Sequence, residues 1–369
     1  MTNILSKLDN SNVVISTLTD KKQQTNYKIK YVSDYVAKWA IISSERDEVT
    51  DITFIDCMCN AGVYKDGDLC TAMEVLMIFD NLAARHPNKT YNLFLNDYDK
   101  GKIDALNEVI ALLGVTKPNI KINVSNKDVN DYLINIKNSR TIFGYSKSVV
   151  LYVDPYDFGT VHIPKVHDIL KTHYCELIFN FFISDYVRNW KQNKDRIAKC
   201  IGGMDISTKE ELISYIDNQF KVGHIKHSFS YQFKTQTNIE LYQILFFTPS
   251  KRGLEVLKET LWNVFGGKFY HKNKKDFDDG QLSLFTEEDD RAWLLNLHAQ
   301  NAKELILSQK DKTMSYSEIE ILLIEKSMLA ENQILNNVIK PLIEDGKITK
   351  LNLVTTKRNY KSDSYTIGE

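Results

Sequence analysis

The run Leu151–Gly159 (LYVDPYDFG) combines residue types that can hold an amine for a chemical step. It is typical of a β-branched strand that ends in Asp154, Pro155 and Tyr156. A carboxylate and a carbonyl stiffened by proline can together accept hydrogen bonds from an exocyclic amine, which leaves the amine lone pair free to attack a methyl donor. Tyr156 can stack on a base. A strand-to-loop turn capped by Asp154 explains the same residues, and both interpretations stay open.

Acidic residues also follow the other predicted strands, at Asp56, Asp97 and Asp128. A carboxylate at Asp97 suits a ribose, because it can accept hydrogen bonds from both hydroxyls of the diol. Asp128 is placed to meet an adenine edge, and the alternative for this residue is a helix cap. A single acid after a strand is usually a turn or cap residue, but several in one domain favour a binding site.

The first of these strands runs into the sequence FIDCMCNAGVY. A tight turn that lets backbone N–H groups approach a ligand needs small residues. Cys59 and Ala61 are small, Gly62 occupies a glycine position, and Asn60 is the non-glycine type best able to adopt a positive φ. We therefore predict a tight turn over these four residues, although the glycine-rich dinucleotide fingerprint is absent.

Strands and helices alternate through the first two thirds of the chain. The predicted strands are 51–56, 91–97, 120–124, 148–154 and 175–182, with a closing antiparallel pair at 228–234 and 240–248. The predicted helices between and around them include 69–85, 102–113, 128–137, 166–171 and 253–265. This order predicts an α/β fold with a doubly wound, Rossmann-like sheet. Ligands of such sheets lie outside the carboxyl ends of the strands, where the acids gather.

The chain divides into four predicted regions. These are an N-terminal arm (1–25), a Rossmann-like domain (26–265), a charged linker (266–290) and a C-terminal domain (291–369). The last region has the helix–helix–hairpin order of a winged helix, with Ser315 and Glu318 at capping-box spacing. Its second helix, 331–344, contains Pro341, which costs a hydrogen bond and bends a helix.

Composition excludes several classes of protein. With 369 residues, 43% hydrophobic residues and a net charge of −1, the chain is neither disordered nor coated with basic charge. Its apolar runs are too short to cross a membrane and its N-terminus lacks a signal peptide, so we expect a cytoplasmic protein without a membrane contact. Five Cys form no disulfide framework, and neither Cys nor His shows a metal-ligand spacing, so we expect no metal.

Positive charges cluster in the predicted C-terminal hairpin. They are Lys347, Lys350, Lys357, Arg358 and Lys361. Most such clusters are solvated faces, but a basic wing is a better than average candidate for nucleic-acid binding. We predict that this wing contacts nucleic acid.

Taken together, these motifs resemble the three-Cys-motif partner (TcmP) family. The resemblance rests on KYVSDYVAKWAII, FIDCMCNAG, LFLNDYDK, VLYVDPYDFG, LIFNFF, and LYQILFFTPSKRGLEVLKETLW followed by GQLSLF, in this order. It implies a class I methyltransferase fold that uses S-adenosylmethionine and carries a C-terminal winged helix. It also implies a partner protein that resembles radical-S-adenosylmethionine enzymes.

The leading hypothesis is therefore an S-adenosylmethionine-dependent methyltransferase acting on an exocyclic amine of a nucleobase in DNA or RNA. Asp56 and the turn Cys59, Asn60, Ala61 and Gly62 would hold the methionine part of the donor, Asp97 its ribose and Asp128 its adenine. Asp154, Pro155 and Tyr156 would orient the acceptor. The alternative is a non-catalytic nucleic-acid-binding partner protein that keeps the fold. Asn60 in the donor turn and Asp157 beside the acceptor motif, where the family pattern differs, favour the alternative.

Overall fold

The computed structural model describes residues 17–183, 194–203, 206, 208–235, 237, 239–272, 287–351 and 363–368. The chain forms two compact units, Met1–Ser250 and Lys251–Glu369, and each is described by itself. The first unit contains every residue predicted for donor and acceptor binding. The second contains the predicted basic hairpin.

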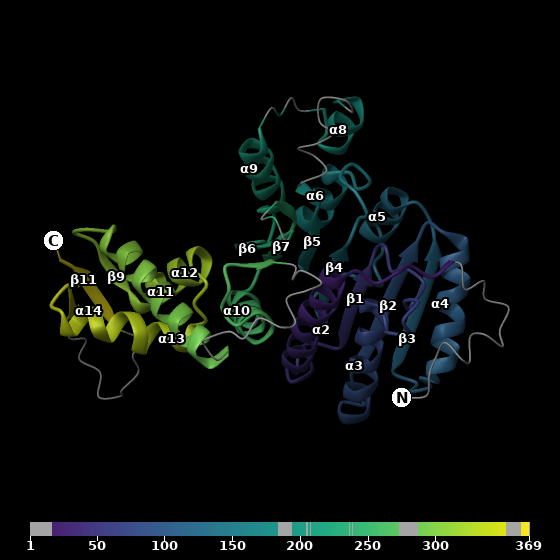
Figure 1. Cartoon of the computed structure of the whole chain (residues 1–369). Helices are drawn as coiled ribbons and strands as arrows, with labels where there is room; N and C mark the ends of the chain where they lie inside the picture. The colour runs from purple at the N-terminus through teal and green to yellow at the C-terminus, as the bar shows by residue number, and fades with distance from the viewer. Residues whose placement is uncertain are drawn as a thin grey trace. The chain divides into compact units, whose positions relative to one another are not determined.

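A twisted sheet organises the first unit (Figure 1). Its strands are β1 (Asp51–Asp56), β2 (Thr90–Asp97), β3 (Ile120–Asn126), β4 (Lys147–Val153), β5 (Glu176–Phe181), β6 (His227–Lys234) and β7 (Glu240–Thr248). They follow one another in the order β3-β2-β1-β4-β5-β7-β6. Strands β1 to β5 pair in parallel, whereas β7 is antiparallel to both β5 and β6. The predicted doubly wound sheet with a closing antiparallel pair is thus confirmed.

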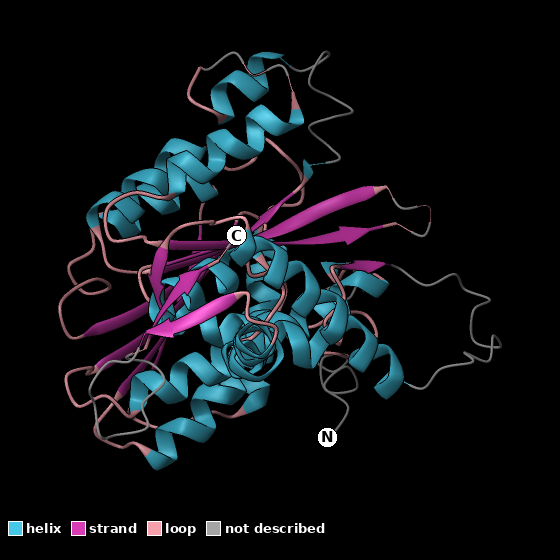
Figure 2. Ribbon diagram, turned by 90° about the vertical axis from the view of Figure 1, so that its left-hand side faces the viewer, coloured by secondary structure: helices cyan, strands magenta, loops and turns pink. Residues whose placement is uncertain are grey.

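Helices cover both faces of this sheet (Figure 2). They are α2 (Gln23–Ser44), α3 (Thr71–Arg85), α4 (Lys100–Leu113), α5 (Val129–Lys137), α6 (Ile163–Thr172), α8 (Lys194–Cys200) and α9 (Lys209–Phe220). Helix α2 packs beside α3, and α6 packs between α5 and α9. The apolar residues of β1 and β4 are buried on both sides, as expected for parallel strands enclosed by helices.

Local signals set several of the helix boundaries. Asp99 caps α4 by accepting hydrogen bonds from the backbone N–H groups of Gly101 and Lys102. The same helix ends at Gly114, which adopts the left-handed conformation with φ of 64°. The last helical residue is therefore Leu113, the end of the predicted range. The Asp99 cap begins α4 at Lys100, directly after β2 ends at Asp97.

The second unit is built mainly from helices. Its elements are α10 (Lys251–Phe265), β8 (Tyr270–Lys272), α11 (Glu287–Leu307), β9 (Thr313–Ser315), α12 (Tyr316–Lys326), α13 (Glu331–Ile334), η3 (Leu335–Ile339), α14 (Lys340–Glu344), β10 (Ile348–Leu351) and β11 (Ser364–Ile367). Strands β10, β11 and β9 form a small antiparallel sheet in that order. Strand β8 and the first residues of α11 fall within the range predicted as a linker.

One local prediction for this unit is confirmed, and a second region differs in detail from its prediction. Ser315 caps α12 in a capping box, because its side chain accepts from the Glu318 N–H and the Glu318 side chain accepts from the Ser315 N–H. The long helix predicted over 331–344 is interrupted by the wider η3 turn just before Pro341. Proline has no N–H to donate to the preceding turn, so the helix changes its hydrogen-bond register there.

Candidate functional site

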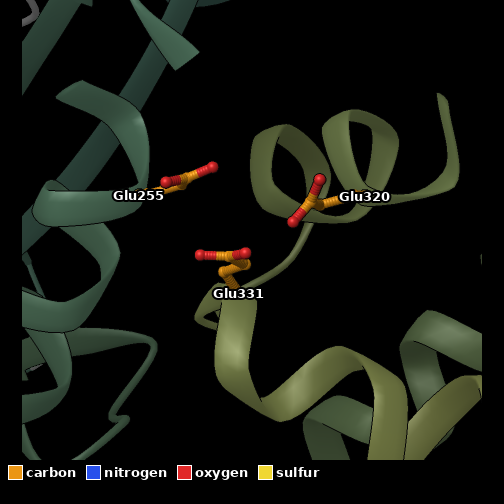
Figure 3. A group of neighbouring side chains, drawn as sticks. All are labelled: Glu255, Glu320 and Glu331. Carbon is orange, nitrogen blue, oxygen red and sulfur yellow. The ribbon is translucent and has the colours of Figure 1, made fainter. Parts of the chain in front are cut away.

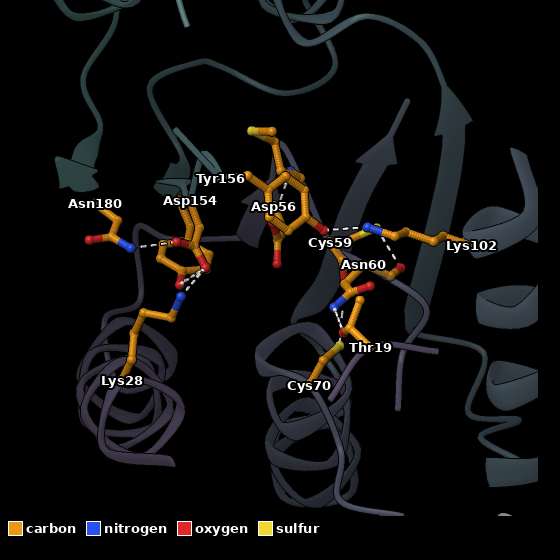
Figure 4. Close-up of polar contacts among 12 residues, drawn as sticks. Thr19, Lys28, Asp56, Cys59, Asn60, Cys70, Lys102, Asp154, Tyr156 and Asn180 are labelled. Atoms are coloured by element: carbon orange, nitrogen blue, oxygen red, sulfur yellow. Dashed lines mark hydrogen bonds and ion pairs between the residues drawn. The ribbon is translucent and has the colours of Figure 1, made fainter. Parts of the chain in front are cut away.

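A cavity of about 330 Å³ opens at the carboxyl ends of β1 and β4. Residues from the segment 19–28, from the turn after β1, from the start of α3 and from the Asp154–Tyr156 motif line it. Phe182 and Tyr242 complete its wall. The predicted site residues in the lining are Asp56, Cys59, Asn60, Asp154, Pro155 and Tyr156. The structure therefore brings one half of the predicted donor turn and the predicted acceptor motif to one cavity (Figure 4).

The turn after β1 has the tight geometry that its sequence predicts. Asn60 adopts φ of 62° and Gly62 adopts φ of 84°. The Asn60 N–H donates to Asp97 Oδ2 at 3.0 Å, and its side-chain Nδ2 donates to Thr19 Oγ1 at 3.0 Å. A Cβ at Gly62 would lie 3.0 Å from Leu106 Cδ1, so glycine also allows α4 to approach closely.

Asp56 is a buried carboxyl at the base of the cavity, with only 2% of its surface exposed. It accepts one hydrogen bond, from the Met58 N–H at 3.1 Å. The pKa of Asp56 rises to about 8, chiefly because of burial; the carboxylates of Asp154 and Asp97 add to the rise, whereas the Met58 N–H and the Lys28 charge oppose it. The carboxyl is therefore mostly protonated and uncharged at neutral pH.

Asp154 is held by three side chains from three different elements (Figure 4). Lys28 of α2 donates to Oδ2 at 2.6 Å, and the Tyr152 hydroxyl donates to the same oxygen at 3.1 Å. Asn180 of β5 donates to Oδ1 at 2.6 Å. A carboxylate offers about four lone-pair sites, so one site on Oδ1 stays available for a ligand. This arrangement fixes the orientation of the carboxylate toward the cavity.

Tyr156 lies at the rim of the cavity with 55% of its surface exposed. The Lys102 ammonium donates to its hydroxyl at 2.5 Å and lies 4.4 Å from the ring centroid. The next residue, Asp157, accepts hydrogen bonds from Arg196 at 2.7 Å and from Thr160. Asp157 does not line this cavity.

Four predicted donor residues do not line the cavity in the described part of the chain, namely Ala61, Gly62, Asp97 and Asp128. Asp97 is 4% exposed and accepts from the backbone N–H groups of Asn60 and Asp99, both at 3.0 Å. Asp128 caps α5 by accepting from the Asn130 N–H at 2.8 Å. In this structure Asp97 braces the turn after β1, and Asp128 has the helix-capping role that the sequence offered as its alternative.

Sequence reasoning missed the residues that position Asp154. Lys28 stands out in the sequence only as a polar residue on an amphipathic helix, for solvent or a ligand. Asn180 sits in the apolar strand CELIFNFF, where a fully buried amide is a signal for a hydrogen-bonded network. Thr19 belongs to the predicted arm, which ion pairs tie down: Lys65 lies 2.9 Å from Asp20, and Lys21 lies 2.9 Å from Asp66.

The five Cys are all free and buried. Cys70 lies at the start of α3, where its thiol donates to the Cys59 carbonyl at 3.4 Å. Burial raises the pKa of Cys57 and Cys59 well above the usual range, so these thiols stay protonated. Neither thiol is ionised in the turn after β1, and Cys59 also lines the cavity. Within the described part of the chain, none of the helices combines the length and the apolar character of a membrane span.

A second cluster of titratable groups lies within the second unit (Figure 3). Oxygens of Glu255, Glu320 and Glu331 all lie within 4.8 Å of one another. Two cations already contact the cluster. Lys251 pairs with Glu320 and lies 3.5 Å from Glu255, and Arg252 lies 2.9 Å from Glu255. The acidic cluster is thus largely neutralised by its own helix α10.

The predicted basic wing is described only in part. Lys350 forms an ion pair with Asp363 at 2.7 Å across β10 and β11, and Lys347 precedes β10. Lys357, Arg358 and Lys361 lie outside the described residues. The nucleic-acid role of these five residues stays a prediction.

No family model and no curated protein matches the sequence. Among solved structures, the chain is similar to protein LPL1258 from Legionella pneumophila (10% identity, 64% of this chain and 91% of that one, TM-score 0.37). It is also similar to human methyltransferase-like protein 13 in complex with SAH (11%, 70% and 97%, TM-score 0.33). A third is a variant of the 16S rRNA (adenine(1408)-N(1))-methyltransferase from Catenulisporales acidiphilia (10%, 58% and 90%, TM-score 0.28). Because these TM-scores lie below 0.5, a functional assignment has to come from the topology and the side chains of this chain.

Proposed function

We propose that the chain is an S-adenosylmethionine-dependent methyltransferase that acts on an exocyclic amine of a nucleobase in DNA or RNA. One observation carries this proposal. The Asp154-Pro155-Tyr156 motif and the turn after β1 open into one cavity at the carboxyl end of a doubly wound sheet. This edge is where such sheets bind their ligands.

The cavity residues fit the amino-acid end of the donor. Asp56 and the turn residues Cys59 and Asn60 lie together in the lining, and the Asn60 Oδ1 atom is buried without a hydrogen-bond partner. A carboxyl and an amide oxygen are suitable acceptors for an ammonium group and suitable neighbours for a sulfonium. S-adenosylmethionine, when bound, supplies an electrophilic methyl group. Asp97 acts indirectly in this proposal, because it holds the turn through the Asn60 N–H.

The acceptor end depends on orientation rather than on strong acid–base chemistry. The free site on Asp154 Oδ1 and the Pro155 carbonyl would accept the two hydrogens of the amine, and Tyr156 would stack on the base at the rim. Lys28, Tyr152 and Asn180 prevent the carboxylate from rotating away. Holding the amine in line with the methyl group supplies most of the rate in a transfer of this kind.

The test combines donor binding with transfer. Asp154→Asn keeps the shape of the side chain but gives Lys28 a neutral partner and removes the acceptor-only carboxylate. We expect donor affinity, measured by isothermal titration calorimetry, to stay within a few-fold of the parent. Labelled-methyl transfer to DNA or RNA should fall by about 100-fold or more. Asp157→Asn is the matched control, because Asp157 lies three residues along the same loop and does not line the cavity. Unchanged transfer by Asp154→Asn would reject the acceptor assignment.

A second candidate is a non-catalytic nucleic-acid-binding partner protein. It is favoured by the engagement of Asp97 and Asp128 in local backbone hydrogen bonds, away from the cavity lining. Binding of S-adenosylmethionine without transfer to any nucleic acid would support this candidate. Absence of donor binding would reject the methyltransferase and leave only a binding role.

We further propose that the second unit is a winged helix whose basic hairpin contacts phosphate. The capped helix α12 and the antiparallel strands β9, β10 and β11 support this fold. Replacing Lys347, Lys357, Arg358 and Lys361 by Ala should weaken nucleic-acid binding regardless of sequence. It should also reduce the salt dependence by up to about 0.9 per lost contact on duplex DNA. An unchanged salt dependence would favour protein docking by this unit.

A further inference from the structure

The ion pair between Lys28 and Asp154 places a positive charge inside the candidate acceptor site. The two side chains are mostly buried, with exposed fractions of 13% and 19%, and both line the cavity. The Lys28 ammonium lies 2.6 Å from Asp154 Oδ2. A pair this close and this shielded from water is only weakly screened by salt. The carboxylate therefore presents hydrogen-bond acceptors to a ligand without presenting a net negative charge.

The other acids of the cavity are also compensated. Asp20 lies at the rim and pairs with Lys65 at 2.9 Å. Asp56 is a buried carboxyl that is mostly uncharged at neutral pH, because burial raises its pKa to about 8. Lys22 adds a positive charge to the exposed part of the lining. The cavity as a whole is thus neutral to slightly positive.

This charge balance separates two classes of amine. An alkylamine, such as a lysine side chain or a polyamine, has a pKa of about 10.4 and enters as a cation at neutral pH. At Asp154 the repulsion from Lys28 would offset the attraction of the carboxylate, so the cation would gain little there in exchange for its lost hydration. The exocyclic amine of a nucleobase is conjugated and uncharged, so it can donate to Asp154 Oδ1 without this repulsion.

We infer that Lys28 is a specificity-determining residue that excludes cationic alkylamines from the acceptor site and admits uncharged, conjugated amines. This inference rests on the proposed function, in which Asp154 receives the acceptor amine. The inference gives a role to a side chain of α2 that lies 126 residues before Asp154 in the sequence. It also explains why a strong cation is placed against the carboxylate when Asn180 and Tyr152 already orient it.

The experiment compares variants of Lys28 on the full-length chain. Lys28→Met keeps the unbranched stem and removes the charge, whereas Lys28→Arg keeps the charge. Lys30→Met is the matched control, because Lys30 lies on the same helix and pairs with Asp34 at the exposed surface. Binding of n-butylammonium and of 2′-deoxyadenosine or 2′-deoxycytidine is measured by calorimetry or ligand-observed NMR, and no turnover is required.

We expect Lys28→Met to bind n-butylammonium at least tenfold more tightly than the parent does. Lys28→Arg and Lys30→Met should bind it with the parent's affinity. The double variant Lys28→Met with Asp154→Asn should lose this gain, because it removes the uncompensated carboxylate. Parent binding of n-butylammonium as tight as that of Lys28→Met would overturn the inference. So would a loss of both ligand types in Lys28→Met with a normal melting temperature, which would make Lys28 a positioning residue only.

These outcomes are distinct from failure of the proposed function. Transfer of labelled methyl groups to polylysine or spermidine by the parent protein would overturn the inference while leaving a methyltransferase. A protein that binds no S-adenosylmethionine would reject the proposed function, yet the n-butylammonium comparison would still report the charge selectivity of the cavity. If all three single variants bind n-butylammonium with the parent's affinity, the inference is rejected whatever the donor result.

Discussion

The buried carboxyl of Asp56 should make the stability of the first unit depend on pH. Its pKa rises from the ordinary 3.8 to about 8 in the folded chain, chiefly because burial disfavours the charged form. Between these pH values the unfolded chain is ionised at this position while the folded chain keeps the proton. The stabilising contribution is thus complete below pH 4 and is lost as the pH rises toward 8. The full pKa difference corresponds to a change of at most about 6 kcal/mol in the free energy of unfolding, at 1.36 kcal/mol per pH unit.

Replacing Asp56 by Asn removes the titration but keeps an acceptor for the Met58 N–H. We expect Asp56→Asn to be more stable than the parent by a few kcal/mol at pH 8 and by little at pH 4.5. Burial also raises the pKa of Glu176 to about 7. Its contribution to the pH dependence of stability is the same in both proteins and therefore cancels in the difference. The measurement is urea denaturation at several pH values, followed by circular dichroism.

Asp51→Asn serves as the control, because Asp51 occupies the solvent end of the same strand β1. Its pH dependence should follow that of the parent. A stability difference between Asp56→Asn and the parent that is the same at pH 4.5 and pH 8 would refute the reasoning. Asp56 would then be ionised in the folded chain, with its charge compensated by its surroundings.

Two further predictions concern the donor end. Binding of S-adenosylmethionine should release a proton from Asp56, because a nearby cation lowers the pKa of a buried carboxyl; affinity should therefore increase as the pH rises toward 8. Calorimetry in buffers of different ionisation enthalpy measures this release, and Asp56→Asn should abolish it. Asp97→Ala should lower the free energy of unfolding by about 1.5–3 kcal/mol, because it leaves the N–H groups of Asn60 and Asp99 without their acceptor. A stable Asp97→Ala protein that loses only donor affinity would instead restore Asp97 as a direct ribose ligand.

The elements of this protein could be predicted from the sequence because their signals are local. Alternating apolar strands and amphipathic helices predict the doubly wound sheet, and the capping box of Ser315 and Glu318 predicts the start of α12. The tight turn after β1 follows from the backbone preferences of Asn60 and Gly62. Each of these features depends on residues within a few positions of one another. The exception is the wider turn before Pro341, where the sequence indicates a bend but not its hydrogen-bond register.

The roles of the acids were decided only by the tertiary structure. Asp56, Asp97, Asp128 and Asp154 all follow strands at one edge of the sheet, yet only Asp56 and Asp154 line the cavity. The difference lies in the available donors: backbone N–H groups occupy Asp97 and Asp128, whereas side chains from α2, β4 and β5 hold Asp154. The position of Lys28 against Asp154 depends on how α2 packs in the first unit. No periodicity or spacing encodes that contact, because it joins two segments that meet only when the chain is folded.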